Sequence, residues 1–267
     1  MGKNILNVEN LIVDKVINDI SFSIKENSIN AFLCPNNCGK TTLIKTLSGV
    51  IYRDSGKIIV NDIELSKADF DKYIVEIGTV LEDVENSFIC ETVIDEIKYP
   101  LINLGYKKSK IKKLVDKISN TIEITSILDN NISELNRVEK IKVLLAASII
   151  HEPKLLLVDD VLRFLNKKEK KEILDLLNII SNELNIAVLY TTSEIEDIIN
   201  IDNIIVFSAG KIKFIDTYKN IIYRDNDLTK MGFVIPVMID LSRKLEFYNL
   251  LDDIYYDPDK VVNKLWN

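Results

Sequence analysis

Short apolar runs near the N-terminus predict strands that lead into a loop and a helix. Residues 4–8 and 18–24 alternate or run apolar as strands do, and 29–33 has the length of a buried strand. The next nine residues, 34–42, read Cys-Pro-Asn-Asn-Cys-Gly-Lys-Thr-Thr, and apolar residues then recur at helical spacing as far as Gly49. Strand, loop and helix in this order form the setting of a phosphate-binding loop.

The middle of the chain reads as a group of helices inserted between strands. Residues 57–65 are typical of a hairpin strand, and 74–81 of another strand. From about 92 to 151 the pattern is helical, with polar breaks at 103–105 and 129–131. We therefore expect a mostly helical insertion after the first strands of a sheet.

Alternating strands and helices return after this insertion. Residues 154–158 form a second fully apolar strand, which ends at Asp159 and Asp160. The pattern then predicts a helix at 168–184, a strand at 186–190, a helix at 194–199 and two strands about Gly210. Beyond residue 217 the chain becomes helical and irregular. The expected fold class is α/β, a P-loop NTPase fold with an inserted helical subdomain and a small C-terminal helical extension.

Composition and charge narrow the possible classes of protein. With 267 residues, 47% of them apolar, the chain can bury the core of one large domain, alone or with a small appendage. No apolar run approaches the roughly eighteen residues of a membrane span, and no signal peptide precedes the first strand, so we expect a soluble chain inside the cell. A net charge of −7 argues against nucleic acid as a main partner.

One segment is locally basic. Lysines stand at positions 107, 108, 110, 112 and 113 of an expected polar helix. A solvated helix face is the favoured interpretation, and an anion-binding surface is the alternative.

The loop at 34–42 matches most of the nucleotide-binding motif GxxxxGK[ST]. In that motif backbone N–H groups point at the β-phosphate, the lysine bridges the β- and γ-phosphates, and the hydroxyl ligates Mg²⁺. The GKT triplet is intact, whereas Cys34 replaces the first glycine; Asn tolerates left-handed backbone, so Asn37 still allows the loop to close. We expect ATP and Mg²⁺ to bind here, through Asn36, Asn37, Cys38, Gly39, Lys40, Thr41 and Thr42.

The cysteines point to a reducing compartment. Cys34, Cys38 and Cys90 form no CxxC pair and no even-numbered framework. We interpret Cys34 and Cys38 as small filler side chains in the loop. A thiol switch that blocks nucleotide binding is the alternative.

Asp159 has the position of a second nucleotide-site residue. A carboxylate at the end of an apolar strand is how P-loop proteins hold Mg²⁺, in the Walker B role. Asp159 follows Lys40 by 119 residues. Small GTPases and nucleotide kinases usually place this acid closer, and a kinase would also need an Arg-rich lid. A long separation filled with helices suits an ABC-type ATPase.

Three further segments resemble the ATPases of energy-coupling factor (ECF) transporters, a subfamily of the ABC proteins. Residues 133–140, Ser-Glu-Leu-Asn-Arg-Val-Glu-Lys, resemble the signature LSGGE or LSGGQ without its glycines. Residues 80–88 resemble the Q-loop V-F-Q-N-P-D-N-Q-F, and the tail from Gly232 is similar to the helical extension of that subfamily. The resemblance implies an ABC ATP-binding domain at 1–217, with a helical subdomain at about 83–151, and a C-terminal helical extension at 218–267.

The resemblance also implies roles for individual residues. Glu82 takes the Q-loop position near Mg²⁺, Asp160 that of the catalytic glutamate, Leu165-Asn166 the D-loop, and Ser193 the position of the switch histidine. Each departs from the family. Asp160 is one methylene shorter than glutamate, and Ser193 cannot carry the charge of an imidazolium, so we expect weak hydrolysis.

Two more departures concern the surroundings of the nucleotide. Asn136, Arg137 and Val138 put bulk where the signature glycines let the backbone approach a partner's γ-phosphate. The alternative to simple loss of the signature motif is that Arg137 supplies a positive charge in its place. Residues 10–14 contain no aromatic ring to stack on adenine, which lowers the expected affinity by about 1–3 kcal/mol.

The tail carries an apolar stripe. Val237, Leu241, Leu245 and Tyr248 follow helical spacing after Pro236. The resemblance implies that this extension contacts a second ABC subunit. Packing on the chain's own domain is the alternative.

Taken together, the resemblance implies the ATP-binding subunit of an ECF-type importer on the cytoplasmic face of the membrane, which couples ATP binding and hydrolysis to uptake of a vitamin or metal ion. Its implied partners are a second ABC ATPase subunit, with a heterodimer favoured, and a transmembrane coupling protein. A non-transport regulatory or scaffold ABC protein that binds ATP with little turnover is the alternative.

Overall fold

Two sheets form the centre of the protein. The structure is a computed structural model and describes residues 2–266. The antiparallel sheet has the order β2-β1-β4-β5, with β1 Asn4–Val13, β2 Ile17–Lys25, β4 Ser55–Val60 and β5 Ile63–Glu64. The second sheet has the order β10-β9-β3-β8-β7-β6, with β3 Ile29–Leu33, β6 Ile77–Val80, β7 Leu155–Val158, β8 Ala187–Thr192, β9 Asn203–Ser208 and β10 Lys211–Asp216.

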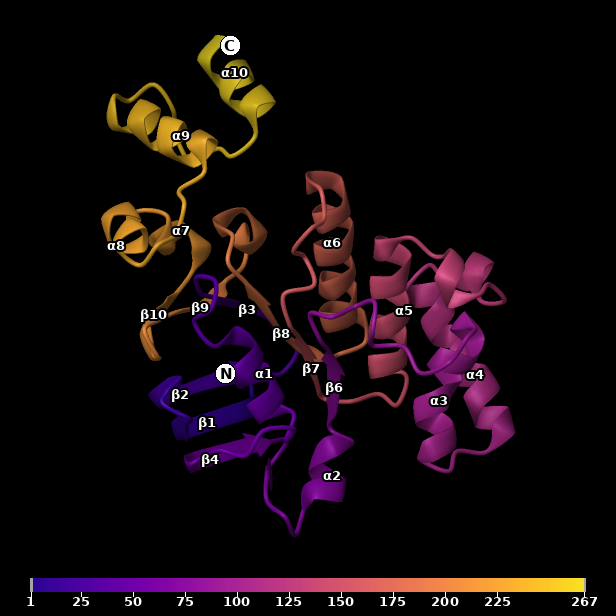
Figure 1. The fold of residues 1–267 in the computed structure, drawn as a ribbon. Helices are drawn as coiled ribbons and strands as arrows, with labels where there is room; N and C mark the ends of the chain where they lie inside the picture. The colour runs from indigo at the N-terminus through magenta and orange to yellow at the C-terminus, as the bar shows by residue number, and fades with distance from the viewer. Residues whose placement is uncertain (1, 267) are drawn as a thin grey trace.

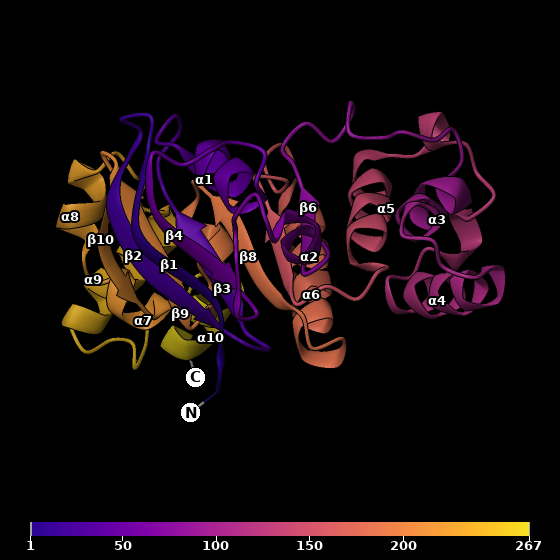
Figure 2. The same cartoon turned by 90° about the horizontal axis from the view of Figure 1, so that it is seen from below.

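The strands β6, β7, β8, β3 and β9 run parallel, and only β10 is antiparallel to its neighbour. All residues of β7 and β8 are buried, which explains why β7 is wholly apolar and why β8 has no hydroxyl-bearing threonine before Thr191. Helix α1 (Lys40–Leu47) packs between the two sheets through Leu43, Ile44 and Leu47. Figures 1 and 2 show the antiparallel sheet and α1 on one side of the parallel sheet.

Most of the other helices lie on the opposite side and build the second core. The helical subdomain contains α3 (Val93–Asn103), α4 (Lys108–Thr121), α5 (Arg137–Ile149) and the short 3-10 turns Thr125–Ile127 and Ile132–Glu134. Helix α6 (Lys167–Glu183) stands between this subdomain and the strands (Figure 1). No helix of residues 2–266 has the length and apolarity needed to cross a membrane.

The predicted elements are confirmed with three local corrections. The strand expected at 74–81 starts only at Ile77, because α2 (Phe70–Ile74) precedes it. The single hairpin strand expected at 57–65 is two strands, since Asn61 and Asp62 adopt positive φ angles of 47° and 65° between β4 and β5. The helix expected at 194–199 is a 3-10 turn at Ile195–Ile198.

The tail consists of four helices, α7 (Tyr218–Ile221), α8 (Asp225–Lys230), α9 (Val237–Phe247) and α10 (Pro258–Trp266). Helix α9 buries Ile239 and Ser242, and the Ser242 hydroxyl accepts a hydrogen bond from the backbone N–H of Tyr255 at 2.7 Å. The predicted stripe lies on another side of α9. Val237 is 80% exposed and Leu241 42%, and Tyr248, just past the helix, is 70% exposed. Leu245, the fourth residue of the stripe, is half-buried, so three of its four apolar side chains are exposed to solvent.

Gly78 of β6 offers a direct test of the packing between the parallel sheet and α5. A Cβ atom built on Gly78 would overlap the backbone carbonyl of Ser148, which is part of α5. We expect Gly78→Ala to lower the free energy of unfolding by about 2 kcal/mol or more, because neither backbone can move away cheaply. Urea denaturation measures the change. Gly2→Ala, whose Cβ meets only ordinary contacts, is the matched control, and equal stability of the two variants would contradict the packing described.

Candidate functional site

Three segments that are far apart in the sequence meet at one edge of the parallel sheet. The loop 34–42 follows β3, the Asp159-Asp160 pair follows β7, and Thr191 and Thr192 end β8. The register pairs Leu33 with Thr192, and the backbone N–H of Cys34 donates to the Thr192 carbonyl at 3.0 Å. Carboxyl ends of neighbouring parallel strands are where α/β proteins bind their ligands.

The loop has the backbone conformation that its sequence suggests. Asn37 and Gly39 adopt positive φ angles of 59° and 112°, and α1 begins at Lys40. The turn between β1 and β2 lies against the loop, because a Cβ on Gly39 would stand 2.7 Å from Cγ1 of Val16. Val16 was not foreseen in the sequence. Its aliphatic side chain lies beside the loop. Like residues 10–14, the turn that carries Val16 contains no aromatic residue.

Lys40 and Asp160 form a buried ion pair. Lys40 Nζ lies 3.0 Å from Asp160 Oδ2, and the two side chains are 7% and 5% exposed. Lys40 also donates to Asn36 Oδ1 at 3.5 Å. Charges this well buried need a partner of opposite sign. A triphosphate bound to the loop would therefore replace Asp160 as the counter-ion of Lys40.

Asp159 is fully buried, and only one of its carboxylate oxygens is hydrogen-bonded. Its Oδ1 accepts from the Thr191 hydroxyl at 2.9 Å, and that hydroxyl oxygen accepts from the Asp160 backbone N–H at 2.9 Å. Its Oδ2 has no hydrogen-bond partner among residues 2–266. Burial raises the pKa of Asp159, the nearby hydroxyls of Thr41 and Thr191 oppose the rise, and the negative charges of Asp160 and Glu82 add to it.

These residues fit a magnesium ion. A cation beside Asp159 would satisfy the orphaned Oδ2 atom and remove the electrostatic cost of the buried charge. Within the described part of the chain no three His, Cys, Asp or Glu side chains converge into a protein-only metal site. Mg²⁺ usually takes only one or two carboxylates and fills its shell with waters and substrate phosphates. Asp159 with the Thr41 hydroxyl matches that smaller set.

Glu82 contacts a residue that the sequence did not single out. Its Oε1 lies 3.0 Å from Arg163 NH1, across the gap between the segment after β6 and the segment after β7. Glu85 pairs in the same way with Lys140 of α5 at 2.5 Å and more loosely with Arg137 at 4.0 Å. Ion pairs thus link the predicted Q-loop to the predicted signature and to the segment that follows Asp160.

Two arginines flank an exposed aromatic ring in this cluster. The guanidinium carbons of Arg163 and Arg137 lie 4.9 Å and 5.6 Å from the centre of the Phe164 ring. The Phe164 side chain is 76% exposed, and its φ angle of 70° is unusual for a residue with a side chain. Arg137 is therefore oriented by Phe164 and Glu85 within its own chain.

At the predicted signature, Asn136 acts as a helix cap. Its side chain accepts from the Glu139 backbone N–H at 3.0 Å, while the Glu139 carboxylate accepts from the Asn136 backbone N–H at 2.9 Å. This reciprocal pair satisfies donors at the start of α5 that would otherwise lack partners. The asparagine thus stabilises the helix in its own chain, in a segment where flexible glycines are expected.

Ser193 is half-buried in the loop after β8, between Thr192 and Glu194. Asp197 accepts from the Thr192 hydroxyl at 2.7 Å and pairs with Lys170 of α6 at 3.0 Å. Burial raises the pKa of Asp197, and the charge of Lys170 opposes the rise. Lys170 Nζ also lies 2.6 Å from Glu194 Oε2, so this ion pair joins the loop that carries Ser193 to α6.

Cys34 and Cys38 correct the expectation of separate thiols. The structure joins them in a disulfide, with Cα atoms 6.4 Å apart. Cys34 is fully buried, whereas Cys90 is a free, partly exposed cysteine. Between the two cysteines the loop bends at Asn37, whose φ angle is positive.

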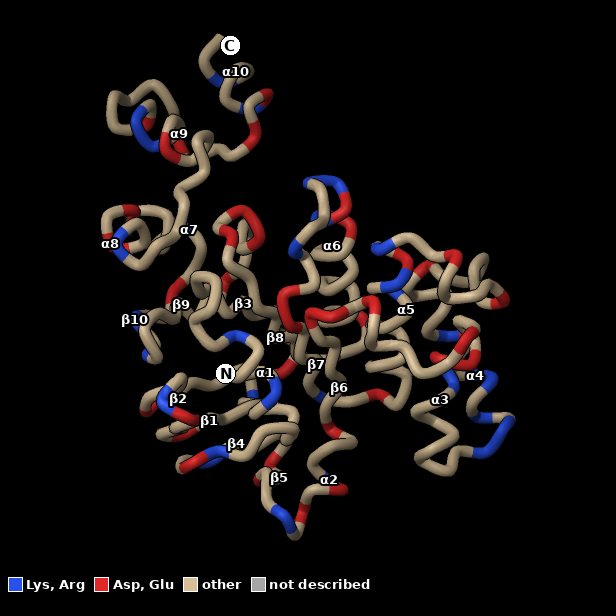
Figure 3. Tube along the Cα trace, in the orientation of Figure 1, with Lys and Arg blue, Asp and Glu red and all other residues tan. Residues whose placement is uncertain are grey.

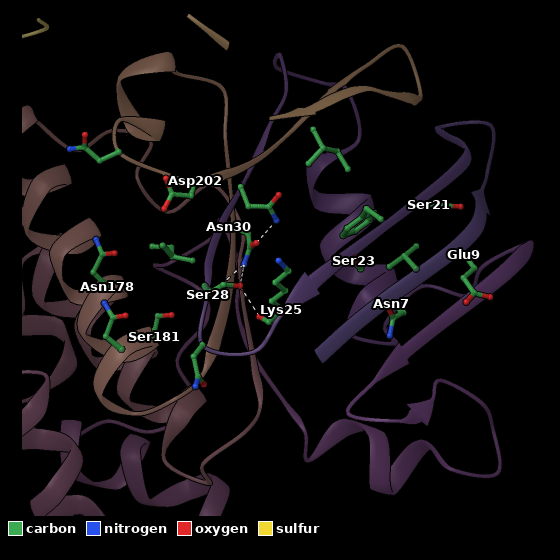
Figure 4. Close-up of a pocket in the computed structure, with 18 residues that line it drawn as sticks. Asn7, Glu9, Ser21, Ser23, Lys25, Ser28, Asn30, Asn178, Ser181 and Asp202 are labelled. Carbon is green, nitrogen blue, oxygen red and sulfur yellow. Dashed lines mark hydrogen bonds between the residues drawn. The ribbon is translucent and has the colours of Figure 1, made fainter. Parts of the chain in front are cut away.

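A large polar cleft lies at the other end of β3 and is separate from these residues. It has a volume of about 920 Å³ and is lined by Ser28, Ile29 and Asn30 at the start of the strand. Figure 4 shows Asn30 between Asn178 and Ser181 on one side and Ser23 on the other. Asn30 is already used internally, since its amide donates to the Val188 carbonyl at 3.0 Å and its oxygen accepts from Asn203 at 2.5 Å. With Lys25 as its one basic residue, the cleft is not built for a triphosphate.

Comparisons with known proteins agree with this geometry. The model of the ABC transporter family matches residues 17–163. The energy-coupling factor transporter ATP-binding protein EcfA2 of Caldanaerobacter subterraneus is 30% identical over 233 residues, which cover 86% of this chain and 82% of the relative. EcfA1 of Lacticaseibacillus paracasei is 26% identical over 253 residues, which cover 94% and 91%.

A solved structure supports the fold. CbiO1 from Clostridium perfringens, described as part of the ABC transporter complex CbiONQ, superposes with a TM-score of 0.79 at 24% identity, covering 92% of this chain and 99% of that one. The matched family region contains the phosphate loop, Asp159 and Asp160. The chain belongs to the ABC transporter family and, within it, to the ATP-binding proteins of energy-coupling factor transporters.

Proposed function

We propose that this chain is the ATP-binding subunit of an ECF-type importer and the hydrolytically weak partner in a heterodimer of ABC ATPases. The observation that carries the proposal is the meeting of Lys40, Asp159 and Asp160 at one edge of the sheet. Mg-ATP binds to the phosphate loop, with Thr41 and Asp159 as the metal ligands. Glu82, whose carboxylate pairs with Arg163, is the third residue that would hold the metal.

Weak hydrolysis follows from the residues around the phosphates. Magnesium, when bound, neutralises charge on the phosphates. Asp160 is the general base for the attacking water, with a side chain roughly 1.5 Å shorter than glutamate, so the water is held less accurately. Ser193 can donate a hydrogen bond to the γ-phosphate but adds no positive charge. Asn136 caps α5, and Arg137 is its first residue. A nucleotide bound to a partner subunit would face these larger side chains in place of the signature glycines.

The partners follow from the same reasoning. A second ABC subunit with an intact signature completes the site at Lys40, and the exposed stripe of α9 helps to hold the two subunits together without nucleotide. A transmembrane coupling protein docks at the segment of Glu82, which places the chain at the cytoplasmic face of the membrane. There the chain supports uptake of a vitamin or metal ion. The second candidate, a regulatory or scaffold ABC protein, is favoured by the capped signature and the ion pairs that already occupy Glu82 and Lys40.

The first test concerns nucleotide binding. We expect Lys40→Ala to weaken binding of a fluorescent ATP analogue in the presence of Mg²⁺ by a factor of ten to a hundred, the effect of losing a charge-assisted contact of about 1.5–3 kcal/mol. Lys45→Ala, at the far end of α1, is the matched control and should bind like the unmodified chain. Equal affinity of the two variants would exclude the phosphate loop as the binding site.

The second test concerns hydrolysis. We expect the purified chain to turn over ATP more slowly than about 1 per second, the lower end of common enzymes. Asp160→Glu should raise the rate, by a factor on the order of a hundred if misplacement of water is the dominant defect. Asp160→Asn, which has the same length as Asp160 but cannot accept the proton, should abolish the remaining activity. Fast turnover by the unmodified chain would show that its departures from the family do not impair the chemistry.

The third test concerns the tail. Removing residues after Tyr218 would also remove Ile222, Leu228 and Phe233, whose side chains are part of the buried core, so substitutions are cleaner than truncation. We expect the triple change Val237→Ser, Leu241→Ser and Tyr248→Ser to weaken nucleotide-free association with the second ABC subunit at least about a hundredfold, because exposed apolar anchors supply most interface energy.

Light scattering measures this association. The double change Val50→Ser and Tyr52→Ser removes apolar side chains of similar exposure, 66% and 78%, from another surface and is the control. A tail variant that associates as well as the control variant would mean that α9 does not form the contact.

A further inference from the structure

The far end of the helical subdomain is a protruding basic tip, which we define as residues 102–113. It includes the last residues of α3, the turn at Gly105 and the first residues of α4. Helix α3 begins beside the predicted signature segment, where Thr92 pairs with Asn131, and then runs for eleven residues, about 16 Å, to this tip. Figure 1 shows the turn between α3 and α4 at the opposite end of the molecule from α9 and α10.

The tip concentrates positive charge, with five lysines among its twelve residues. Its five lysines are all exposed and form no salt bridge within residues 2–266; they are Lys107, Lys108, Lys110, Lys112 and Lys113. Ile111 and Leu114 of α4 face the core of the subdomain, so the lysines of this helix lie on its outer side. Figure 3 shows this stretch as a blue segment at the edge of the molecule. Asp116, one turn further along, is the nearest acidic residue in α4.

Exposed apolar side chains stand next to the lysines. Ile102 is 59% exposed and Leu104 is 43% exposed, on the turn that leads into the basic helix. The Tyr106 ring lies under the ammonium group of Lys110, 4.3 Å from the ring centre. Solvation alone explains the lysines, but it does not explain why two large aliphatic side chains project into water beside them. Lysines that border exposed apolar residues are the pattern of a surface that contacts lipid headgroups.

We propose that the basic tip binds the anionic headgroups of a membrane surface, with Ile102 and Leu104 entering the layer below them. The overall charge of −7 does not prevent this, because in salt solutions of physiological strength charges beyond roughly 8–10 Å are screened and the tip acts locally. The site depends on neither ATP nor a transport partner. It gives the subunit a lipid contact of its own, in addition to the proposed protein partners.

Vesicle sedimentation with the purified full chain tests this contact. Vesicles of phosphatidylcholine with a third of phosphatidylglycerol should bind the chain in about 0.1 M salt, where the distant acidic residues are screened, and vesicles of phosphatidylcholine alone should not. The triple change Lys108→Gln, Lys112→Gln and Lys113→Gln should weaken binding about a hundredfold, at about fivefold for each lysine. The triple change Lys167→Gln, Lys168→Gln and Lys171→Gln removes the same charge from exposed positions on α6 and should leave binding unchanged.

A fluorescent probe reports on the apolar part of the tip. In the background Trp266→Phe, which removes the single native tryptophan, Leu104→Trp should shift the fluorescence emission to the blue with anionic vesicles and not with neutral ones. The proposal is overturned if the two lysine variants bind alike, if neutral vesicles bind as well as anionic ones, or if the emission of the Leu104→Trp variant does not move. Retention of RNA in place of vesicles would also overturn it. None of these results depends on ATPase activity or on the second ABC subunit.

Discussion

Asp159 and Asp160 follow β7, a strand with no exposed residue, and the protein has to stabilise both carboxylates away from water. Asp160 is paired with Lys40, while Asp159 has the Thr191 hydroxyl on one oxygen and, among residues 2–266, no hydrogen-bond partner on the other. Burial of an ionised group without compensation is costly. The phosphate loop, β7 and β8 therefore depend on each other, because each contributes one part of this arrangement.

The same constraint determines what a bound nucleotide would change under the proposed function. A triphosphate would bring negative charge to Lys40 in place of Asp160, and its magnesium ion would supply positive charge beside Asp159. Ion pairs link the surrounding segments, with Glu82 on Arg163 and Glu85 on Lys140. The negative charge of Glu82 also contributes to the raised pKa of Asp159, so the two carboxylates are electrostatically linked.

Much of the fold could be predicted because its signals are local. The apolar runs of β3 and β7, the helical spacing after Lys40 and the acidic end of β7 are each visible within about ten residues. Thr191, Arg163 and Val16 could not be predicted in this way. Thr191 is 32 residues from the carboxylate that it contacts, and Arg163 is 81 residues from Glu82, so their roles depend on strand order and loop packing. The Cys34–Cys38 contact was missed because it depends on the bend of the loop between the two cysteines, where Asn37 has a positive φ angle.

The central claim is that the buried Asp159 carboxylate is held for magnesium at an ATP site. The most direct measurement is calorimetric titration of ATP with and without Mg²⁺, for the unmodified chain and for Asp159→Asn. The account predicts that removing Mg²⁺ weakens ATP binding to the unmodified chain at least tenfold and leaves binding to Asp159→Asn nearly unchanged. An equal dependence on Mg²⁺ in both proteins would contradict it.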